Sequence, residues 1–203
     1  MSRGTDIMEE TPARERILRA AVDIIAAEGE AALRLADVAA AAGVALSLTT
    51  HYFRTRDHLV AEALAERFAG LVRDDLRRIA RLVREGDGGA FRDGLTRLTA
   101  DVLDRRRSTQ RLARIAAVGG AHGRPDLAQR LGEETAALLD ELAVVIRAAQ
   151  ESGLVRADLD PRALATFLQA YSLGMVVADL DARPSDRADV QAVIDVFMGC
   201  VQA

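Results

Sequence analysis

A single glycine between two short helical patterns constrains the fold of this chain more than any other feature. Apolar residues recur at helical spacing over residues 35–42, and a second short pattern covers residues 46–52. Gly43 lies between them, where a residue without a side chain can take a positive φ and end the first helix. The small Ala39 lets the two helices approach, and Val44 supplies an apolar plug for the turn. This arrangement predicts a helix-turn-helix.

The second of these helices carries side chains that suit neither a core helix nor a plain solvated one. Residues 46–53 read LSLTTHYF, with three hydroxyl residues ahead of two adjacent aromatic residues, in a chain that is only 3% aromatic. The second helix of a helix-turn-helix lies in the major groove of DNA, where hydroxyl and methyl groups reach base edges and arginine or tyrosine holds phosphates. We therefore expect this helix to read DNA and Phe53 to anchor it in the core. The predicted contacts are Leu46, Ser47, Leu48, Thr50, His51, Tyr52, Arg54 and Arg56.

The net charge of the chain does not by itself favour nucleic acid. It is −4 at pH 7, and residues 1–60 contain seven arginines against nine acidic residues. All 27 basic residues are arginine, since lysine is absent. Any phosphate contact must therefore come from a guanidinium, a histidine, a hydroxyl or a backbone amide, and geometry must gather the few positive groups on one face.

Helical spacing of apolar residues extends over the rest of the sequence, without a strand pattern or an internal repeat. The first helix is expected to begin at Thr11-Pro12 and to end at Gly29. The predicted fold is all-α, with about nine helices. The helices expected after the glycine turn run from Arg56 to about residue 85 and over residues 91–105, 108–118, 126–151, 161–180 and 186–201.

The segment from about residue 11 to residue 62 resembles the TetR (tetracycline repressor) family of bacterial regulators. The motifs that carry the resemblance are Leu35-Ala36-Asp37-Val38-Ala39, Ala42-Gly43-Val44, His51-Tyr52-Phe53 and Thr55-Arg56-Asp57. Their combined spacing is specific, although each piece alone is weak. The resemblance implies an all-helical homodimer, usually a repressor, that a small molecule releases from its operator.

The chain departs from the family pattern at three places near the reading helix. Arg34 stands where the family commonly has a capping Ser or Thr, so we expect it to contact phosphate instead. Ala45 replaces a frequent serine at the start of the reading helix and is included among the predicted DNA contacts. Thr49-Thr50 replaces the commoner Leu-Tyr pair, with Thr49 expected half-buried. The operator sequence therefore cannot be taken from relatives.

We divide the chain into a helix-turn-helix domain, residues 1–55, and a helical effector-binding and dimerisation domain, residues 56–203. Residues 1–10 are expected to form a flexible arm. The last two predicted helices carry broad apolar faces, which favour a four-helix interface across a two-fold axis, with an ordinary intrachain core as the alternative. Two reading helices one DNA turn apart would read a palindromic operator in double-stranded DNA. The expected interface residues are Leu164, Leu168, Met175, Val190, Ile194, Phe197 and Val201.

Aliphatic residues of the middle helices could surround a cavity. Such a lining is typical of a ligand pocket but equally of a packed core, and the sequence leaves both open. We expect a small hydrophobic effector. It would bind better to the conformer in which the DNA-binding helices of the two subunits are not positioned to fit the operator. The expected pocket residues are Phe68, Leu71, Leu103, Ile115, Val118, Leu138, Leu142, Phe167 and Tyr171.

Other classes of function find little support in the sequence. It has no GxGxxG, GxxxxGK[ST] or HExxH motif, so we expect no enzyme and no cofactor. His51 and His58 are not at metal-binding helical spacing, and no metal site is expected.

No secretory segment or apolar run of about 18 residues is present, so a cytoplasmic protein without membrane contact is expected. Cys200, the only cysteine, is expected to be buried. The alternative function is a helical ligand carrier or interaction protein whose reading head no longer binds DNA.

Overall fold

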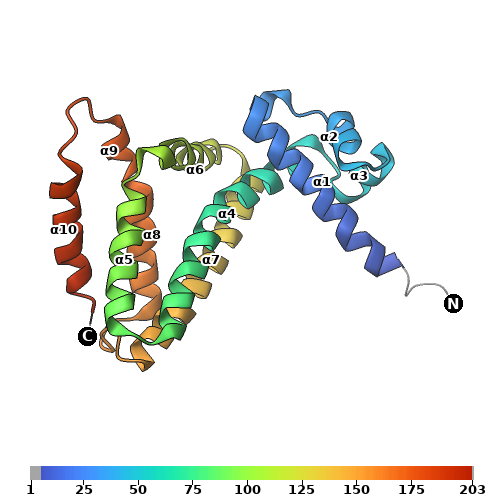
Figure 1. Ribbon diagram of the computed structural model, residues 1–203. Coiled ribbons are helices and arrows are strands. Elements are labelled where there is room, and N and C mark those ends of the chain that lie inside the picture. The colour runs from blue at the N-terminus through green and yellow to red at the C-terminus, as the bar shows by residue number, and fades with distance from the viewer. Residues whose placement is uncertain (1–5, 203) are drawn as a thin grey trace. The chain divides into compact units, whose positions relative to one another are not determined.

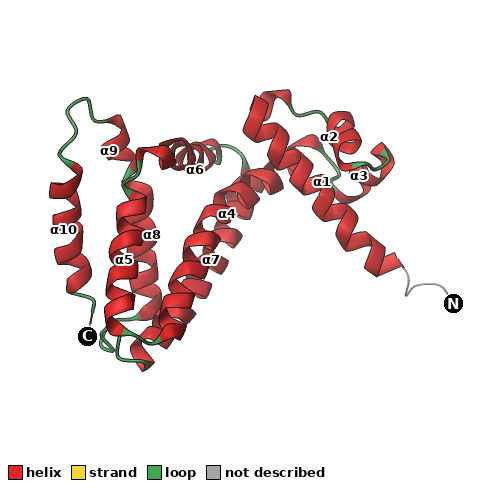
Figure 2. Cartoon of the chain, in the orientation of Figure 1, coloured by secondary structure: helices red, strands yellow, loops and turns green. Residues whose placement is uncertain are grey.

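The computed structural model describes residues 6–202, and every regular element among them is a helix (Figures 1 and 2). These residues divide into two compact units. Unit 1 contains the described residues up to Phe68 together with the segment Gly120–Gly132, and unit 2 contains Ala69–Gly119 and the residues from Glu133 onward. The all-α prediction is confirmed for the described part of the chain.

Unit 1 begins with α1, Asp6–Glu28, followed by a short 3-10 helix, η1, Glu30–Ala32. Helix α1 starts before Thr11-Pro12, the predicted start, because the acidic run ahead of them favours a helix N-terminus. The rest of the predicted arm lies outside the described residues. The further helices of unit 1 are α2, Leu35–Ala42, α3, Leu46–Tyr52, and the first part of α4, Arg56–Glu85.

The turn between α2 and α3 has the geometry that the glycine predicted. Gly43 is left-handed, with φ 65° and ψ 41°. Its amide donates to the Ala40 carbonyl at 3.2 Å, and the Val44 amide donates to the Ala39 carbonyl at 3.0 Å. This pair of bonds is the Schellman arrangement, which satisfies the last carbonyls of α2. Because the turn is closed by backbone bonds, α3 leaves it in a defined direction.

The core of unit 1 is aliphatic apart from one aromatic ring. Phe53 is fully buried, as predicted, and Val44 packs against the core beneath the turn. Thr55 caps α4, because its hydroxyl accepts from the His58 amide at 3.0 Å. The buried side chains of this core are Ile17, Ala20, Ala21, Ile25, Leu33, Val38, Ala42, Phe53, Leu59, Val60 and Ala63.

Unit 2 contains the remaining helices, apart from the start of α7, which belongs to unit 1, and several of them are started by an aspartate. Asp87, Asp160 and Asp186 each accept a hydrogen bond from a backbone amide in the first turn of the helix that follows. The helix predicted over residues 161–180 is divided at Met175. The elements are α5, Gly88–Val102, η2, Arg105–Arg107, α6, Ser108–Gly120, α7, Pro125–Glu151, α8, Pro161–Gly174, α9, Val176–Leu180, and α10, Arg187–Gly199.

The core of unit 2 joins α4, α5, α7 and α8. A side chain at Gly94 would collide with Leu82, so this glycine lets α5 lie close against α4. Cys200 is exposed, and the prediction that it is buried is wrong. It is the C-cap residue of α10, just after the last turn of that helix. The buried core residues are Leu76, Val83, Phe91, Leu95, Leu142, Ile146, Ala149, Leu154, Val155 and Ala165.

One segment of unit 2, Pro161–Leu180, is long and apolar enough to cross a membrane by length and composition. Its two charged residues are paired within the unit, Arg162 with Asp140 and Asp179 with Arg111. A single segment of this kind does not indicate a membrane protein, because core and interface helices pass the same test.

Candidate functional site

Helix α3 has one buried face and one exposed face. Thr49 and Phe53 are fully buried. Ser47, Thr50 and His51 are exposed on the other side, as are the flanking Ala45 and Arg54. Leu46 leaves 47% of its surface exposed. The predicted separation of an anchored face from a hydroxyl-bearing face is therefore present.

The two threonines of α3 differ in their hydrogen bonds. The Thr50 hydroxyl donates back to the Ser47 carbonyl at 3.0 Å and lies 3.3 Å from the Leu46 carbonyl. Since its one proton is used, Thr50 offers an outside partner a methyl group and acceptor lone pairs. The Thr49 hydroxyl is buried and has no hydrogen-bond partner among the described residues. Thr49 is thus more deeply buried than the half-buried position expected.

The aromatic cluster at the end of α3 fixes the helix to unit 1. The rings of His51 and Tyr52 meet edge to face, with centroids 5.3 Å apart. Tyr52 and Leu48 are half-buried, so each combines a contact with the unit and an outward surface. Arg14 lies over the buried Phe53 ring at 5.3 Å. These contacts hold the exposed side of α3 in place.

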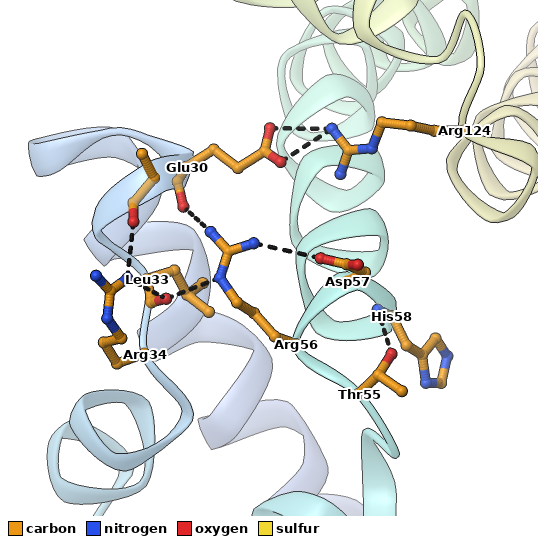
Figure 3. A network of polar contacts seen from close by, with 9 residues as sticks. Glu30, Leu33, Arg34, Thr55, Arg56, Asp57, His58 and Arg124 are labelled. Atoms are coloured by element: carbon orange, nitrogen blue, oxygen red, sulfur yellow. Dashed lines mark hydrogen bonds and ion pairs between the residues drawn. The ribbon is translucent and has the colours of Figure 1, made fainter.

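Two of the arginines predicted to touch DNA are bonded within unit 1 (Figure 3). Arg56 donates from Nε to the Leu33 carbonyl at 3.0 Å and from Nη2 to the Glu30 carbonyl at 2.5 Å. Arg34 donates from Nη1 to the Ala31 carbonyl at 2.8 Å. These guanidinium groups bond to the carbonyls around η1, and the Glu30 carbonyl also accepts from the Leu33 amide at 3.2 Å. Arg54 is exposed and is placed differently.

A segment far along the chain is bonded to the same region. Arg124, just ahead of α7, pairs with Glu30 at 2.9 Å (Figure 3). Arg130 in α7 donates to Glu62 of α4 at 3.0 Å, and Arg14 of α1 donates to the other oxygen of Glu62 at 3.0 Å. Sequence reasoning missed these ion pairs, because no local pattern joins residues that are 48 to 94 positions apart.

Unit 2 contains a pocket with a volume of about 140 Å³. Among the nine predicted pocket residues, Leu142 and Tyr171 line it. Phe68 and Leu138 are buried elsewhere, Leu103 is half-buried, and Ile115, Val118 and Phe167 are exposed. The side chain of Leu71 lies outside the described residues. Half of the lining residues are apolar, among them Val72, Leu76, Ile79, Leu95, Leu98 and Leu168.

Charged residues, which sequence reasoning missed, form one side of this pocket. Arg111 makes a two-pronged bond to Asp179, at 2.6 Å from Nε and 2.5 Å from Nη2, and both side chains are under 10% exposed. Arg107 donates to both oxygens of Asp75, at 3.2 and 3.0 Å. Burial lowers the pKa of Arg114 to about 10, opposed by the nearby Asp75 carboxylate, so Arg114 is charged at neutral pH.

Two neutral polar residues of α8 also line the pocket. Gln169 is 9% exposed, and its Nε2 atom is buried with no hydrogen-bond partner in the described part of the chain. The Tyr171 hydroxyl is also buried and has no hydrogen-bond partner among the described residues. Burial raises the pKa of Tyr171 to about 12, and the charge of Asp195 adds to the shift, so the phenol is neutral at physiological pH.

The predicted interface residues lie on helices that expose apolar surface. Ile194 is buried and Phe197 is 61% exposed. Leu164, Leu168, Met175, Val190 and Val201 are half-buried. Leu168 also lines the pocket. The apolar side chains of α8 to α10 that are more than half exposed are Phe167, Val177, Leu180, Val193, Val196 and Phe197. Within residues 6–202 no three acidic, histidine or cysteine side chains group as a metal site.

Comparison with known proteins relates the N-terminal part to a family and the whole chain to a fold. Residues 17–63 match the family described as bacterial regulatory proteins, tetR family. No curated protein matches the chain. Among solved structures, a protein described as a TetR-family transcriptional regulator from Rhodococcus sp. is 28% identical, with a TM-score of 0.64 over 95% of this chain and 100% of that one.

Two further structures share the fold at lower identity. One, described as a TetR-family transcriptional regulator from Mesorhizobium loti, is 17% identical, with a TM-score of 0.66 over 96% of this chain and 98% of that one. The other, a transcriptional regulator from Saccharomonospora viridis solved in complex with choline, is 22% identical, with a TM-score of 0.60 over 95% and 99% of the two chains.

Proposed function

Because the chain belongs to the TetR family of bacterial regulatory proteins, we propose that it regulates transcription as a homodimeric repressor that binds a palindromic operator. A small effector would release it by binding better to a conformer that does not fit DNA. In this proposal residues 1–55 form the DNA-binding domain, and residues 56–203 bind the effector and pair the subunits.

The observation that carries the proposal is the two-sided character of α3. Its inner side is fixed by Thr49 and Phe53, while Ser47, Thr50 and His51 face outward beside an exposed Leu46. Hydroxyl, imidazole and methyl groups on a helix held by a closed turn are what the major groove accepts. The hydrogen bonds of Arg34 and Arg56 to the η1 carbonyls favour a positioning role for these two and leave Arg54 as the better phosphate contact.

Pairing of two chains is supported by the exposed apolar surface on α8 to α10. Large patches of this kind on a soluble protein mark interaction sites. A two-fold axis through this surface would pair the same helices of both chains. The choline complex of the Saccharomonospora viridis neighbour supports an effector site in this fold, although its low identity does not transfer the ligand.

Selection from random duplex DNA with the purified protein tests the proposal. We expect enrichment of a palindrome and an affinity that falls steeply with salt concentration. Thr50→Ala should change the preferred base at particular positions, whereas Thr109→Ala, an exposed threonine of α6, should leave the preference unchanged. Arg54→Ala should weaken all duplexes alike and lower the salt slope by about one, compared with Arg147→Ala in α7.

Two results would contradict the proposal. Indifference to every duplex would favour the ligand carrier with an inactive reading head. An enriched site without two-fold symmetry, together with a monomeric protein in sedimentation, would exclude the paired repressor.

A further inference from the structure

The pocket of unit 2 contains buried donors that the described part of the protein does not use. Gln169 and Tyr171 both line the pocket, and neither Gln169 Nε2 nor the Tyr171 hydroxyl has a hydrogen-bond partner among the described residues. Most buried polar groups in proteins are paired, and an unpaired one destabilises the fold. Two such groups in one pocket indicate that a ligand supplies the missing acceptors.

Two acceptors of the lining are already engaged. Asp75 is the one carboxylate in the described lining, and both its oxygens accept from Arg107. The Thr99 hydroxyl donates to the Leu95 carbonyl at 3.0 Å and accepts from Gln191 Nε2 at 3.0 Å. Gln110 and Ser172 also line the pocket and can both donate and accept, so the lining offers a ligand more donors than acceptors.

The charged side chains of the lining disfavour a cationic ligand. Arg107, Arg111 and Arg114 all contribute to it. Arg107 and Arg111 are paired with Asp75 and Asp179, so three guanidinium groups stand against two carboxylates. The excess positive charge opposes a cationic ligand.

The remaining walls and the volume define the body of the ligand. Aliphatic side chains from α4, α5, α7 and α8 form the apolar part of the lining. The volume of about 140 Å³ is close to that of an apolar cavity of about 150 Å³ that admits benzene. An apolar body of about one ring fits this space.

We propose that the unit 2 pocket binds an apolar molecule of about one ring in size that carries a carboxylate or carbonyl oxygen. The oxygen accepts a hydrogen bond from Gln169 Nε2 or from the Tyr171 hydroxyl, and the aliphatic walls enclose the ring. This inference rests on the proposed function, since it names the chemical class of the effector.

Four probes of matched size test this assignment by calorimetry and by thermal unfolding of the full-length protein. Benzoate and acetophenone present the anionic and the neutral oxygen acceptor, benzylamine presents a cation, and toluene presents neither. We expect benzoate or acetophenone to bind and raise the melting temperature, and benzylamine and toluene to bind at least about tenfold more weakly, as the loss of one hydrogen bond to a buried donor implies. Equal or tighter binding of benzylamine or toluene, or no binding by any probe, would overturn the assignment.

Two variants connect the binding to the named donors. Gln169→Leu and Tyr171→Phe remove unpaired buried groups, so each should fold at least as stably as the parent protein while the better oxygen probe binds one of them about tenfold more weakly. Tyr52→Phe, which changes the other tyrosine of the chain, should leave the affinity unchanged. Unchanged affinity in both pocket variants would remove Gln169 and Tyr171 from the ligand site.

The outcome is separable from that of the DNA experiment. Failure of all probes with retained operator binding would overturn only the ligand class. Probe binding without any operator would leave the pocket assignment in place and contradict the proposed function.

Discussion

Arg124 and Glu30, which are 94 residues apart in the sequence, form an ion pair at 2.9 Å in unit 1. The Glu30 carbonyl also accepts from Arg56, so the same short helix is held by guanidinium groups from two directions (Figure 3). The chain between α6 and α7 is therefore bonded to the segment that leads into α2. This link joins Glu30, in the proposed DNA-binding domain, to a residue that lies outside residues 1–55 but within unit 1.

Charge reversal at Arg124 should lower the stability of unit 1 only modestly. The two side chains are 32% and 37% exposed, so Arg124→Glu is expected to lower the free energy of unfolding by about 1 kcal/mol, measured by urea denaturation. The swap Arg124→Glu with Glu30→Arg should restore it. Under the proposed function Arg124→Glu also weakens operator binding. Arg78→Glu, which breaks the comparably exposed pair with Asp101 in unit 2, should not. Equal effects of both reversals on DNA affinity would refute a specific role of Arg124.

Thr49→Val should stabilise the protein. The Thr49 hydroxyl is buried without a partner in the described structure, and valine keeps the branched shape while removing the unpaired group. We expect a gain of about 1 kcal/mol in chemical denaturation. The matched control is Thr99→Val, where the buried hydroxyl makes hydrogen bonds, and a loss of similar size is expected there. A loss of stability in Thr49→Val would show that this hydroxyl has a partner.

Arg111→Met should be strongly destabilising, because it leaves the Asp179 carboxylate charged and 8% exposed without its two-pronged partner. Breaking a buried pair in this way costs about 3–5 kcal/mol. The double variant Arg111→Met with Asp179→Leu should recover most of the loss, since no buried charge remains. Arg162→Met, which breaks an exposed pair, should have a much smaller effect. A double variant as unstable as the single one would point to the hydrogen bonds of Arg111 to the Val102 and Asp104 carbonyls instead.

Tyr171 should titrate far above the ordinary range of a phenol. Its pKa is raised from 10.0 to about 12, first by burial and then by Asp195. At a pH below 10.0, the pKa in the unfolded chain, the phenol is neutral in both the folded and the unfolded state, and its contribution to stability is complete. As the pH rises towards the higher value, the unfolded chain loses this proton first, so stability falls.

The measurement uses Tyr52→Phe, which leaves Tyr171 as the one tyrosine of the chain. Ultraviolet absorbance of the phenolate should give a midpoint near 12 in the folded protein and near 10 in denaturant, with circular dichroism to monitor folding. Phenolate absorbance separates Tyr171 from Arg114, whose pKa is lowered to about 10 by burial and which titrates in the same range. A folded-state midpoint near 10 would mean that the phenol is solvated.

The helix-turn-helix could be predicted because its structure depends on neighbouring residues. A glycine that can take positive φ, a hydroxyl cap and helical spacing are properties of neighbouring residues. The bounds of α2 and α3, the left-handed Gly43 and the burial of Phe53 were therefore all predicted from the sequence.

Contacts between distant residues left no such signal. Nothing near Arg56 indicates that it bonds to η1, and nothing near Arg130 indicates Glu62. The pocket was sought among aliphatic residues, whereas its distinctive members are the arginines of η2 and α6 and Gln169, which become pocket residues only when the helices pack. The DNA contacts, the interface residues and the domain boundary stay predictions.

The shared carboxylate of Glu62 has a practical consequence for dissecting this protein. It is 11% exposed and bonded to guanidinium groups from α1 and α7. A recombinant fragment that stops at Phe68 would keep Arg14 but lose Arg130. The nearly buried Glu62 carboxylate would then retain one of these two guanidinium partners. We therefore do not expect residues up to Phe68 to be stable as a separate fragment. A shortened protein would also have to include residues 120–132.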